Sequence, residues 1–238
     1  MMGESAMLDL VYECRNFLND FGFPYAICGG YAIEMFLGKE IRPHGDLDIS
    51  IFYEDRKHIV DFILSRGWDI YTQPDKAKYI ELITRSDDSK VLNPSGLFAV
   101  KPRCTLFELE PVPGYKTKFK FEDTNNRQTD FDFIDIIFNK QQDNKFLFWP
   151  FTNRGKNITR ELDKAILYHE DIPYLSPEVM LLIISPPEYF SSDYHKDKNC
   201  IDFESTIPYL PNESRGWLIN ALKTVYPEGH RWFEQLNT

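Results

Sequence analysis

The feature that most constrains this chain is a short segment in which carboxylates alternate with apolar side chains. It reads Asp46-Leu47-Asp48-Ile49-Ser50-Ile51. Strict alternation predicts a half-buried β-strand, and residues i and i+2 of a strand point to the same face. Asp46 and Asp48 should therefore project from one face, about 7 Å apart along the chain. Two carboxylates so placed repel each other unless a cation lies between them, and such oxygen ligands suit Mg²⁺ together with substrate phosphates.

A Gly-Gly pair lies upstream of this segment. Gly29 and Gly30 follow the short apolar run 24–28, which predicts a buried strand, and precede residues 31–37, which have helical apolar spacing and end at Gly38. A strand, a Gly-Gly turn and a helix N-terminus present main-chain N–H groups without side-chain obstruction, which suits phosphate oxygens. A phosphate-binding turn near a carboxylate pair indicates a nucleoside triphosphate as ligand.

These motifs resemble a known family. The residues that carry the resemblance are Gly29-Gly30-Tyr31-Ala32, Leu37-Gly38 and Arg42-Pro43-His44-Gly45-Asp46-Leu47-Asp48-Ile49. They are similar to the nucleotidyltransferase superfamily related to DNA polymerase β, in the branch of the aminoglycoside 2''-adenylyltransferases and lincosamide nucleotidyltransferases. Tyr31 stands where that branch usually has Trp.

The resemblance implies roles for several of these residues. Asp46 and Asp48 would bind two Mg²⁺ ions, and the segment containing Gly29, Gly30 and Tyr31 would bind the nucleotide. Arg42 would either neutralise charge on the leaving pyrophosphate or act as a structural cation that fixes the loop before the strand.

Such enzymes need a third carboxylate from another strand of the same sheet. Residues 129–138 are aromatic and β-branched enough to form that strand, and they contain Asp130, Asp132 and Asp135. Asp130 lies at the start of the segment, where we expect solvent. Asp132 and Asp135 differ in parity, so a regular strand would point them to opposite faces. We favour Asp135 as a catalytic and metal-binding residue because its apolar neighbours make an unpaired carboxylate costly, and Asp132 remains the alternative.

Charge and composition narrow the substrate class. The chain has 238 residues with 37 acidic and 27 basic side chains, a net charge of −10. Binding a long nucleic acid usually requires a basic surface, so we expect a small acceptor instead. Four widely spaced cysteines favour free thiols in a reducing compartment. No apolar run approaches the ~20 residues of a membrane span, so we expect a cytoplasmic protein without a membrane partner.

The order of elements predicts an α+β fold, with a mixed β-sheet nucleotidyltransferase core followed by a C-terminal helical segment. We expect a catalytic domain over residues 1–165 and a helical domain over residues 166–238. Ser176-Pro177-Glu178 predicts a helix start, with Ser as N-cap, Pro in the first helical position and an acid in the first turn.

The function we expect is metal-dependent transfer of a nucleoside monophosphate to a hydroxyl of a small molecule. The donor would be ATP or another nucleoside triphosphate, and aminoglycosides and lincosamides are acceptors that the resemblance suggests. Two alternatives stay open: a protein adenylyltransferase of the toxin–antitoxin type, and a non-catalytic nucleotide-binding protein. Nothing in the sequence indicates the oligomeric state.

Overall fold

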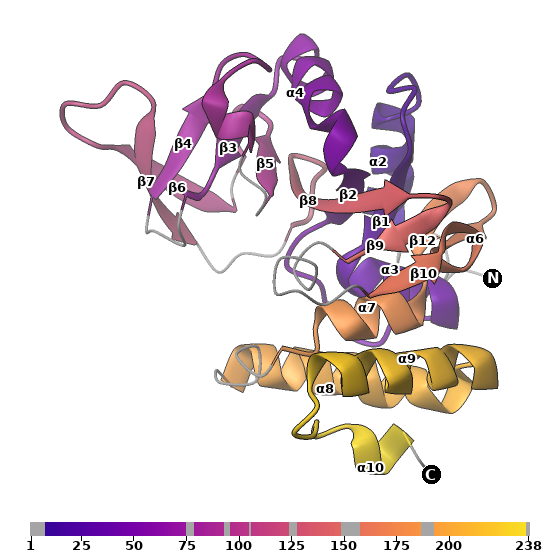
Figure 1. Ribbon diagram of the computed structural model, residues 1–238. Helices are drawn as coiled ribbons and strands as arrows, with labels where there is room; N and C mark the ends of the chain where they lie inside the picture. Colours follow the sequence, from indigo (N-terminus) through magenta and orange to yellow (C-terminus); the bar gives the residue numbers. More distant parts are fainter. Residues whose placement is uncertain are drawn as a thin grey trace. The chain divides into compact units, whose positions relative to one another are not determined.

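The computed structural model describes residues 8–74, 79–92, 96–104, 106–123, 128–148, 158–186 and 193–236. The chain divides into two compact units (Figure 1). Unit 1 comprises residues 1–27 and 44–139, and unit 2 comprises residues 28–43 and 140–238. The domain boundary after residue 165 stays a prediction, because the two units group segments by packing and each contains two stretches of the chain.

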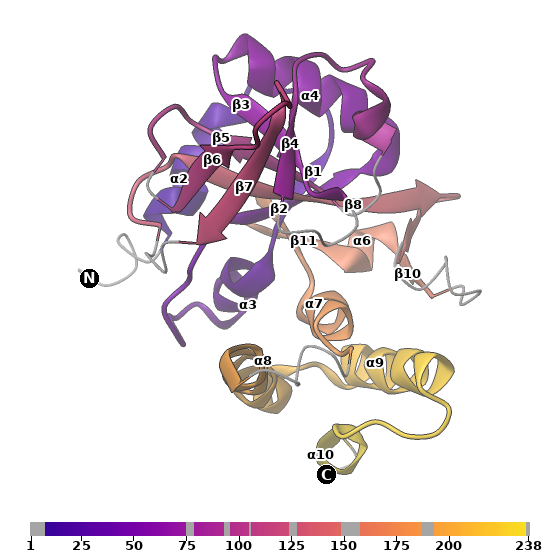
Figure 2. The same cartoon turned by 90° about the vertical axis from the view of Figure 1, so that its left-hand side faces the viewer.

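Unit 1 is built on a mixed β-sheet with the strand order β1-β2-β8-β5-β3-β4-β7-β6. The strands are β1 (Tyr25–Cys28), β2 (Asp48–Phe52), β3 (Asp69–Thr72), β4 (Tyr79–Ile83), β5 (Leu97–Val100), β6 (Phe107–Pro111), β7 (Lys118–Asp123) and β8 (Phe133–Gln142). The pairing of β2 with β8 is parallel, whereas every pairing from β8 through to β6 is antiparallel. The sheet is therefore mixed, and β8 lies in its interior between β2 and β5 (Figure 2).

Two helices pack on this sheet through aromatic side chains. They are α2 (Asp9–Phe17) and α4 (Arg56–Ser65), the second preceded by the short 3₁₀ turn η1 (Tyr53–Asp55). The Phe17 ring lies 5.6 Å from Phe62, 4.8 Å from Trp68 and 5.4 Å from Phe131, measured between ring centroids. Because Phe131 lies two residues before β8, this cluster connects the helices to the interior strand. A second 3₁₀ turn, η3 (Ser89–Leu92), precedes β5.

Unit 2 is mainly helical. Its helices are α3 (Gly29–Leu37), α6 (Leu162–Ala165), α7 (Pro177–Ile183), α8 (Asp193–Thr206), α9 (Asn212–Val225) and α10 (Phe233–Leu236), with the 3₁₀ turn η5 (Ile207–Tyr209) after α8. The end of β8 pairs with β9 (Lys145–Leu147), which pairs with β10 (Thr159–Glu161), and β11 (Ile166–His169) forms a hairpin with β12 (Ile172–Leu175). The expected α+β class with a helical C-terminal part is confirmed (Figures 1 and 2).

Local details refine the sequence-based expectations. Helix α7 begins at Pro177 with Ser176 as N-cap, as predicted, but the Ser176 side chain makes no capping hydrogen bond. Strand β8 begins at Phe133 rather than at residue 129 and runs on to Gln142. The four cysteines are free thiols. Within the described part of the chain, no helix is long and apolar enough to cross a membrane.

Unit 2 contains a buried ion-pair network around Arg160 on β10. The Arg160 side chain is 5% exposed and pairs at 2.7 Å with Glu178, which is 2% exposed. It also donates to both carboxylate oxygens of Glu213, at 2.7 and 2.8 Å. These hydrogen bonds, with Lys164 nearby, lower the pKa of Glu213 to about 2. The network joins β10, α7 and α9.

The two glutamates should differ in their effect on stability. Glu178→Ala removes the buried partner of a buried cation, a loss of about 3–5 kcal/mol in the free energy of unfolding. Glu213→Ala should lower it by less than about 1 kcal/mol, because the Glu213 side chain is 58% exposed. Urea denaturation of both variants measures the two values. Equal losses would contradict the placement of Glu178 as the buried member.

Candidate active site

Three aspartates of unit 1 lie together at one end of the parallel strand pair. Asp48 is the first residue of β2, and it stands opposite Asp135 of β8 in the strand register. Asp46 lies two residues before β2. Each of the three side chains offers a carboxylate oxygen within 4.8 Å of the other two. Asp46 is exposed, while Asp48 and Asp135 are half-buried. The fold therefore brings together three carboxyl groups, one each from β2, β8 and the loop before β2.

The main chain fixes this arrangement from both sides. The Asp135 N–H donates to the Leu47 carbonyl at 2.9 Å. Leu47 lies between Asp46 and Asp48, so this hydrogen bond joins the main chain of all three predicted ligands. Ile134 and Ile136 on either side of Asp135 are fully buried, as is Leu47. These buried neighbours hold both strands in the core while the carboxylates extend from them.

Gln128 adds a second connection that the sequence did not reveal. Its side chain is buried, accepts a hydrogen bond from the Leu47 N–H at 3.0 Å and donates to the Phe133 carbonyl at 2.9 Å. Its own N–H donates to the Gly45 carbonyl at 2.9 Å. One glutamine thus joins the loop that carries Asp46 to the start of β8. Only the burial of an amide in the folded chain identifies it, because a glutamine before a strand is common in sequences.

The electrostatics of the site centre on Asp135. Burial, and then the charge of Asp46, raise the pKa of Asp135 from the ordinary 3.8 to about 7. Both causes penalise the ionised form. A bound divalent cation would stabilise the ionised form of Asp135 against both effects. The three carboxylates offer hard oxygen ligands, which are the kind that Mg²⁺ prefers.

Asp132 and Asp130 lie outside this group. Asp132 precedes β8, its carbonyl accepts a hydrogen bond from the Lys101 N–H at 2.8 Å, and its N–H donates to the Asp130 carbonyl at 2.9 Å. Asp130 is exposed. Of the aspartates that competed in the sequence analysis, Asp135 is the one that joins Asp46 and Asp48.

Gly96 is a second residue that the sequence analysis missed. It lies directly before β5 with φ +135°, a conformation that side chains disfavour. A Cβ at this position would lie 2.8 Å from the Ile136 carbonyl oxygen and 3.9 Å from Oδ1 of Asp135. The missing side chain therefore allows β5 to approach β8 beside the carboxylate. The signal in the sequence is one glycine in a loop, which many functions explain equally well.

The predicted nucleotide-binding segment lies in unit 2, at the beginning of α3. Gly29 is the first residue of the helix and has φ +66°, which favours glycine. Gly30 and Tyr31 follow in the first turn and are buried. The expected strand, Gly-Gly turn and helix are present as β1 and α3, with the helix starting two residues earlier than the apolar spacing indicated. The first-turn amides of a helix have no partner within the helix and suit an anion.

Arg42, also in unit 2, forms an ion pair. Its Nε and Nη2 donate to the two carboxylate oxygens of Asp202 at 2.7 and 2.8 Å, and both side chains are largely buried. The preceding residue, Ile41, is also held in place, because its N–H donates to the buried Glu34 carboxylate at 2.8 Å. A bidentate pair of this kind orients the guanidinium firmly. Of the two roles considered for Arg42, this geometry favours that of a structural cation that fixes the loop before β2.

Comparisons with known proteins concern the first part of the chain and the fold. The model of the family described as aminoglycoside-2''-adenylyltransferase matches residues 10–90, which include the Gly-Gly and Asp-x-Asp segments and end before Asp135. The crystal structure of ANT(2'')-Ia in complex with adenylyl-2''-tobramycin is similar with a TM-score of 0.53 and 12% identity, over 90% of this chain and 95% of that one. Residues 10–90 therefore resemble this family, and the chain shares the fold of ANT(2'')-Ia.

Two further solved structures are similar to this chain. The solution structure of the antibiotic-resistance factor ANT(2'')-Ia gives a TM-score of 0.49 at 14% identity, over 94% of this chain and 95% of that one. Lincosamide antibiotic adenylyltransferase LnuA with bound lincomycin gives 0.46 at 15%, over 83% and 94%. No curated protein sequence matches significantly.

The raised pKa of Asp135 makes a stability prediction for the protein in metal-free buffer. The folded state holds the Asp135 proton up to about pH 7, whereas the unfolded state loses it near 3.8. Stability should therefore fall as pH rises between these values and level off above pH 7. Asp135→Asn should raise Tm at pH 8 in EDTA, with a gain that vanishes near pH 4. Thermal unfolding across this range measures it.

Asp132→Asn is the matched control, since it makes the same substitution next to the same strand but outside the carboxylate group. It should show no gain that grows with pH. A gain of equal size in both variants, or a lower Tm for Asp135→Asn at pH 8, would contradict the clustering of the three charges.

Gly96 leads to a second prediction about stability. Gly96→Ala forces a Cβ against the Ile136 carbonyl and should lower the free energy of unfolding by about 1–3 kcal/mol beyond backbone strain alone. Gly67→Ala is the control, because Gly67 has φ +77° and a Cβ added there would meet no atom within 4 Å. Chemical denaturation compares the two, and an equal loss would show that β5 does not approach β8 this closely.

Proposed function

We propose that this protein transfers a nucleoside monophosphate, AMP from ATP, to a hydroxyl of a small molecule in a reaction that requires a divalent metal. The observation that carries the proposal is the convergence, within 4.8 Å, of carboxylate oxygens of Asp48 on β2, Asp135 on the adjacent β8 and Asp46 in the loop before β2. Maintaining three carboxylates so close together is unfavourable unless cations use them. The family match and the shared fold support phosphoryl-group chemistry for such a cluster.

In this proposal the three aspartates hold the metal. Bound Mg²⁺ supplies charge neutralisation for a triphosphate and lowers the pKa of an attacking hydroxyl. The chain's own residues provide the rigid placement: β2 and β8 fix Asp48 and Asp135, and Gln128 fixes the loop with Asp46. Asp135 has a pKa near neutrality before any cation binds, so it is also suited to accept the proton that the acceptor hydroxyl loses.

For the nucleotide, we propose that the amides of Gly29, Gly30 and Tyr31 at the start of α3 contact phosphate oxygens. A side chain at Gly29 would be strained by its positive φ, which supports a main-chain role. Arg42 contributes by holding its segment of chain through Asp202. Its charge is therefore mostly satisfied within the protein.

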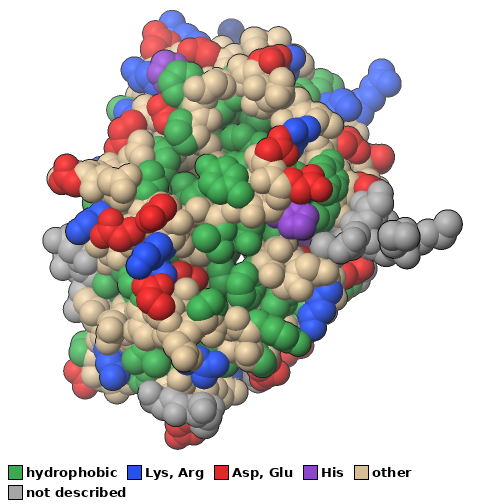
Figure 3. Space-filling view, turned by 90° about the vertical axis from the view of Figure 1, so that its right-hand side faces the viewer, with side chains coloured by type: hydrophobic (Ala, Val, Ile, Leu, Met, Phe, Trp, Pro, Cys, Tyr) green, Lys and Arg blue, Asp and Glu red, His purple; other side chains and the backbone are tan. Residues whose placement is uncertain are grey.

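For the acceptor, we propose a hydroxylated small molecule of the antibiotic class. The matched family is described as an aminoglycoside-2''-adenylyltransferase, and the ANT(2'')-Ia crystal structure holds adenylyl-2''-tobramycin. The surface also favours a small acceptor. On the face drawn in Figure 3, Lys and Arg side chains are scattered among Asp and Glu rather than gathered in a basic stripe, and the net charge is −10.

The test is transfer of label from α-³²P-labelled ATP to a panel of aminoglycosides and lincosamides, with Mg²⁺ or with EDTA. We expect labelled product and pyrophosphate only with Mg²⁺. Asp48→Asn should slow turnover by about a hundredfold or more, the scale on which loss of one preorganised electrostatic group slows an enzyme. Asp132→Asn, the matched control, should stay within a few-fold of the native rate.

Other outcomes would replace the proposal. Equal turnover in EDTA, or a larger loss for Asp132→Asn than for Asp48→Asn, would contradict the role of the three aspartates. Label on a protein with no label on any small molecule would favour a protein adenylyltransferase. Metal-dependent ATP binding with no transfer to any acceptor would favour a non-catalytic nucleotide-binding protein.

A further inference from the structure

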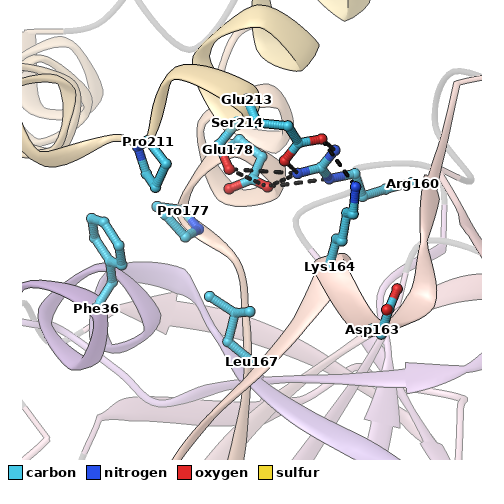
Figure 4. Close-up of a pocket in the computed structure, with 10 residues that line it drawn as sticks. All are labelled: Phe36, Arg160, Asp163, Lys164, Leu167, Pro177, Glu178, Pro211, Glu213 and Ser214. Carbon is cyan, nitrogen blue, oxygen red and sulfur yellow. Dashed lines mark hydrogen bonds and ion pairs between the residues drawn. The ribbon is translucent and has the colours of Figure 1, made fainter.

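Unit 2 contains a cavity of about 240 Å³ beside the Arg160 network (Figure 4). One part of its wall is apolar and is formed by Phe36, Leu167, Pro177 and Pro211. The other part is formed by the charged side chains of β10, α6, α7 and α9. A cavity with an apolar wall and a few convergent polar groups is the usual form of a small-molecule site.

The cations of the wall are already engaged. Arg160 directs Nε and Nη2 to Glu178 and directs Nη1 and Nη2 to Glu213. The Lys164 ammonium donates to Glu213 at 3.3 Å. The Arg160 guanidinium also lies over the Trp217 ring, 5.2 Å from its centroid. An anionic ligand would therefore have to compete with Glu178 and Glu213 for Arg160, whereas the Lys164 ammonium is 47% exposed and solvated.

One of the two oxygens of the Glu178 carboxylate can accept further hydrogen bonds. Its three donors are Arg160 Nε at 3.2 Å, Arg160 Nη2 at 2.7 Å and Ser214 Oγ at 3.0 Å, and all three bond to Oε1. Among the described residues no hydrogen bond ends on Oε2, and Figure 4 shows that oxygen turned away from Arg160. The Glu178 residue is only 2% exposed, but its Oε2 is not among the fully buried polar atoms that lack a partner, so this oxygen is accessible from the cavity that Glu178 lines. A carboxylate oxygen so placed can accept a charge-assisted hydrogen bond from a ligand.

The balance of charge selects the ligand. The wall carries two cations, Arg160 and Lys164, and three carboxylates, on Asp163, Glu178 and Glu213. Arg160 is shared between Glu178 and Glu213, and Lys164 pairs with Glu213, so the carboxylates of the wall exceed its cations by one. A group that brings donors and positive charge satisfies Glu178 Oε2, whereas an anion would be repelled by it.

We propose that this cavity binds a small ammonium-bearing molecule with a compact apolar body, the ammonium donating to Glu178 and the apolar body packing against Phe36 and Leu167. The site lies wholly within unit 2 and does not depend on nucleotidyl transfer. It goes beyond the proposed function because it assigns a second ligand position with its own chemistry.

The experiment titrates three probes of matched shape into the full-length protein in EDTA: cyclohexylmethylamine, cyclohexylmethanol and cyclohexanecarboxylate. Heteronuclear NMR follows the shifts of residues around the cavity, Leu167 and Ser214 among them. We expect saturable shifts there, with the amine at least about tenfold tighter than the alcohol, because a charge-assisted hydrogen bond exceeds a neutral one. The carboxylate should not bind.

Three variants separate the site from general effects. Glu178→Gln should weaken the amine about tenfold or more and change the alcohol less than about threefold. Leu167→Phe leaves the ion pairs intact but crowds the position proposed for the apolar body, so it should weaken the binding of both. Tyr168→Ala, the adjacent residue on β11 with 67% exposure, is the control and should bind as the native chain does.

Absence of saturable shifts for the amine would overturn the proposal, as would equal affinity for amine and alcohol. Unchanged amine binding in Leu167→Phe would overturn it as well, and this variant stands even where Glu178→Gln fails to fold. Because every titration is carried out without metal or nucleotide, failure here would leave the proposed transfer reaction untouched.

Discussion

Repulsion among Asp46, Asp48 and Asp135 is the constraint on which the rest of unit 1 depends. Three carboxylate oxygens within 4.8 Å favour separation, and the pKa of Asp135 is raised to about 7, first by burial and then by the charge of Asp46. The fold opposes separation with the parallel pairing of β2 and β8 and with the buried Gln128 amide. A structure that resists this repulsion in its native state is prepared to bind cations with little rearrangement.

Much of this site could be predicted from the sequence. The alternation around Asp48 indicated a strand, and the apolar neighbours of Asp135 indicated a carboxylate that needed a partner. Even so, Asp46 lies before β2 rather than on it, so its position beside Asp48 comes from a loop and not from strand parity. Gln128 and Gly96 act only through β8 contacts that are distant in sequence. Local patterns carry no record of such contacts, which is why both were missed.

The same limit explains what was missed in the fold. Strand β5 has only four residues, and its place between β8 and β3 depends on pairing with residues far along the chain. In unit 2 the helices were readable from their apolar spacing, but the β11–β12 hairpin was not expected. Its turn includes Glu170 at φ +54°, a conformation in which Gly or Asn is the usual signal, so the sequence there gives no turn signature. Ion pairs such as Arg42 with Asp202 join residues 160 positions apart and lie equally beyond local reading.

The central claim is that the three aspartates form a metal site, and anomalous diffraction from crystals soaked in Mn²⁺ tests it most directly. The account predicts an anomalous peak in contact with carboxylate oxygens of Asp46, Asp48 and Asp135, and no such peak in crystals of Asp135→Asn soaked in the same way. A native crystal with Mn²⁺ bound at other carboxylates and no peak among these three would contradict it.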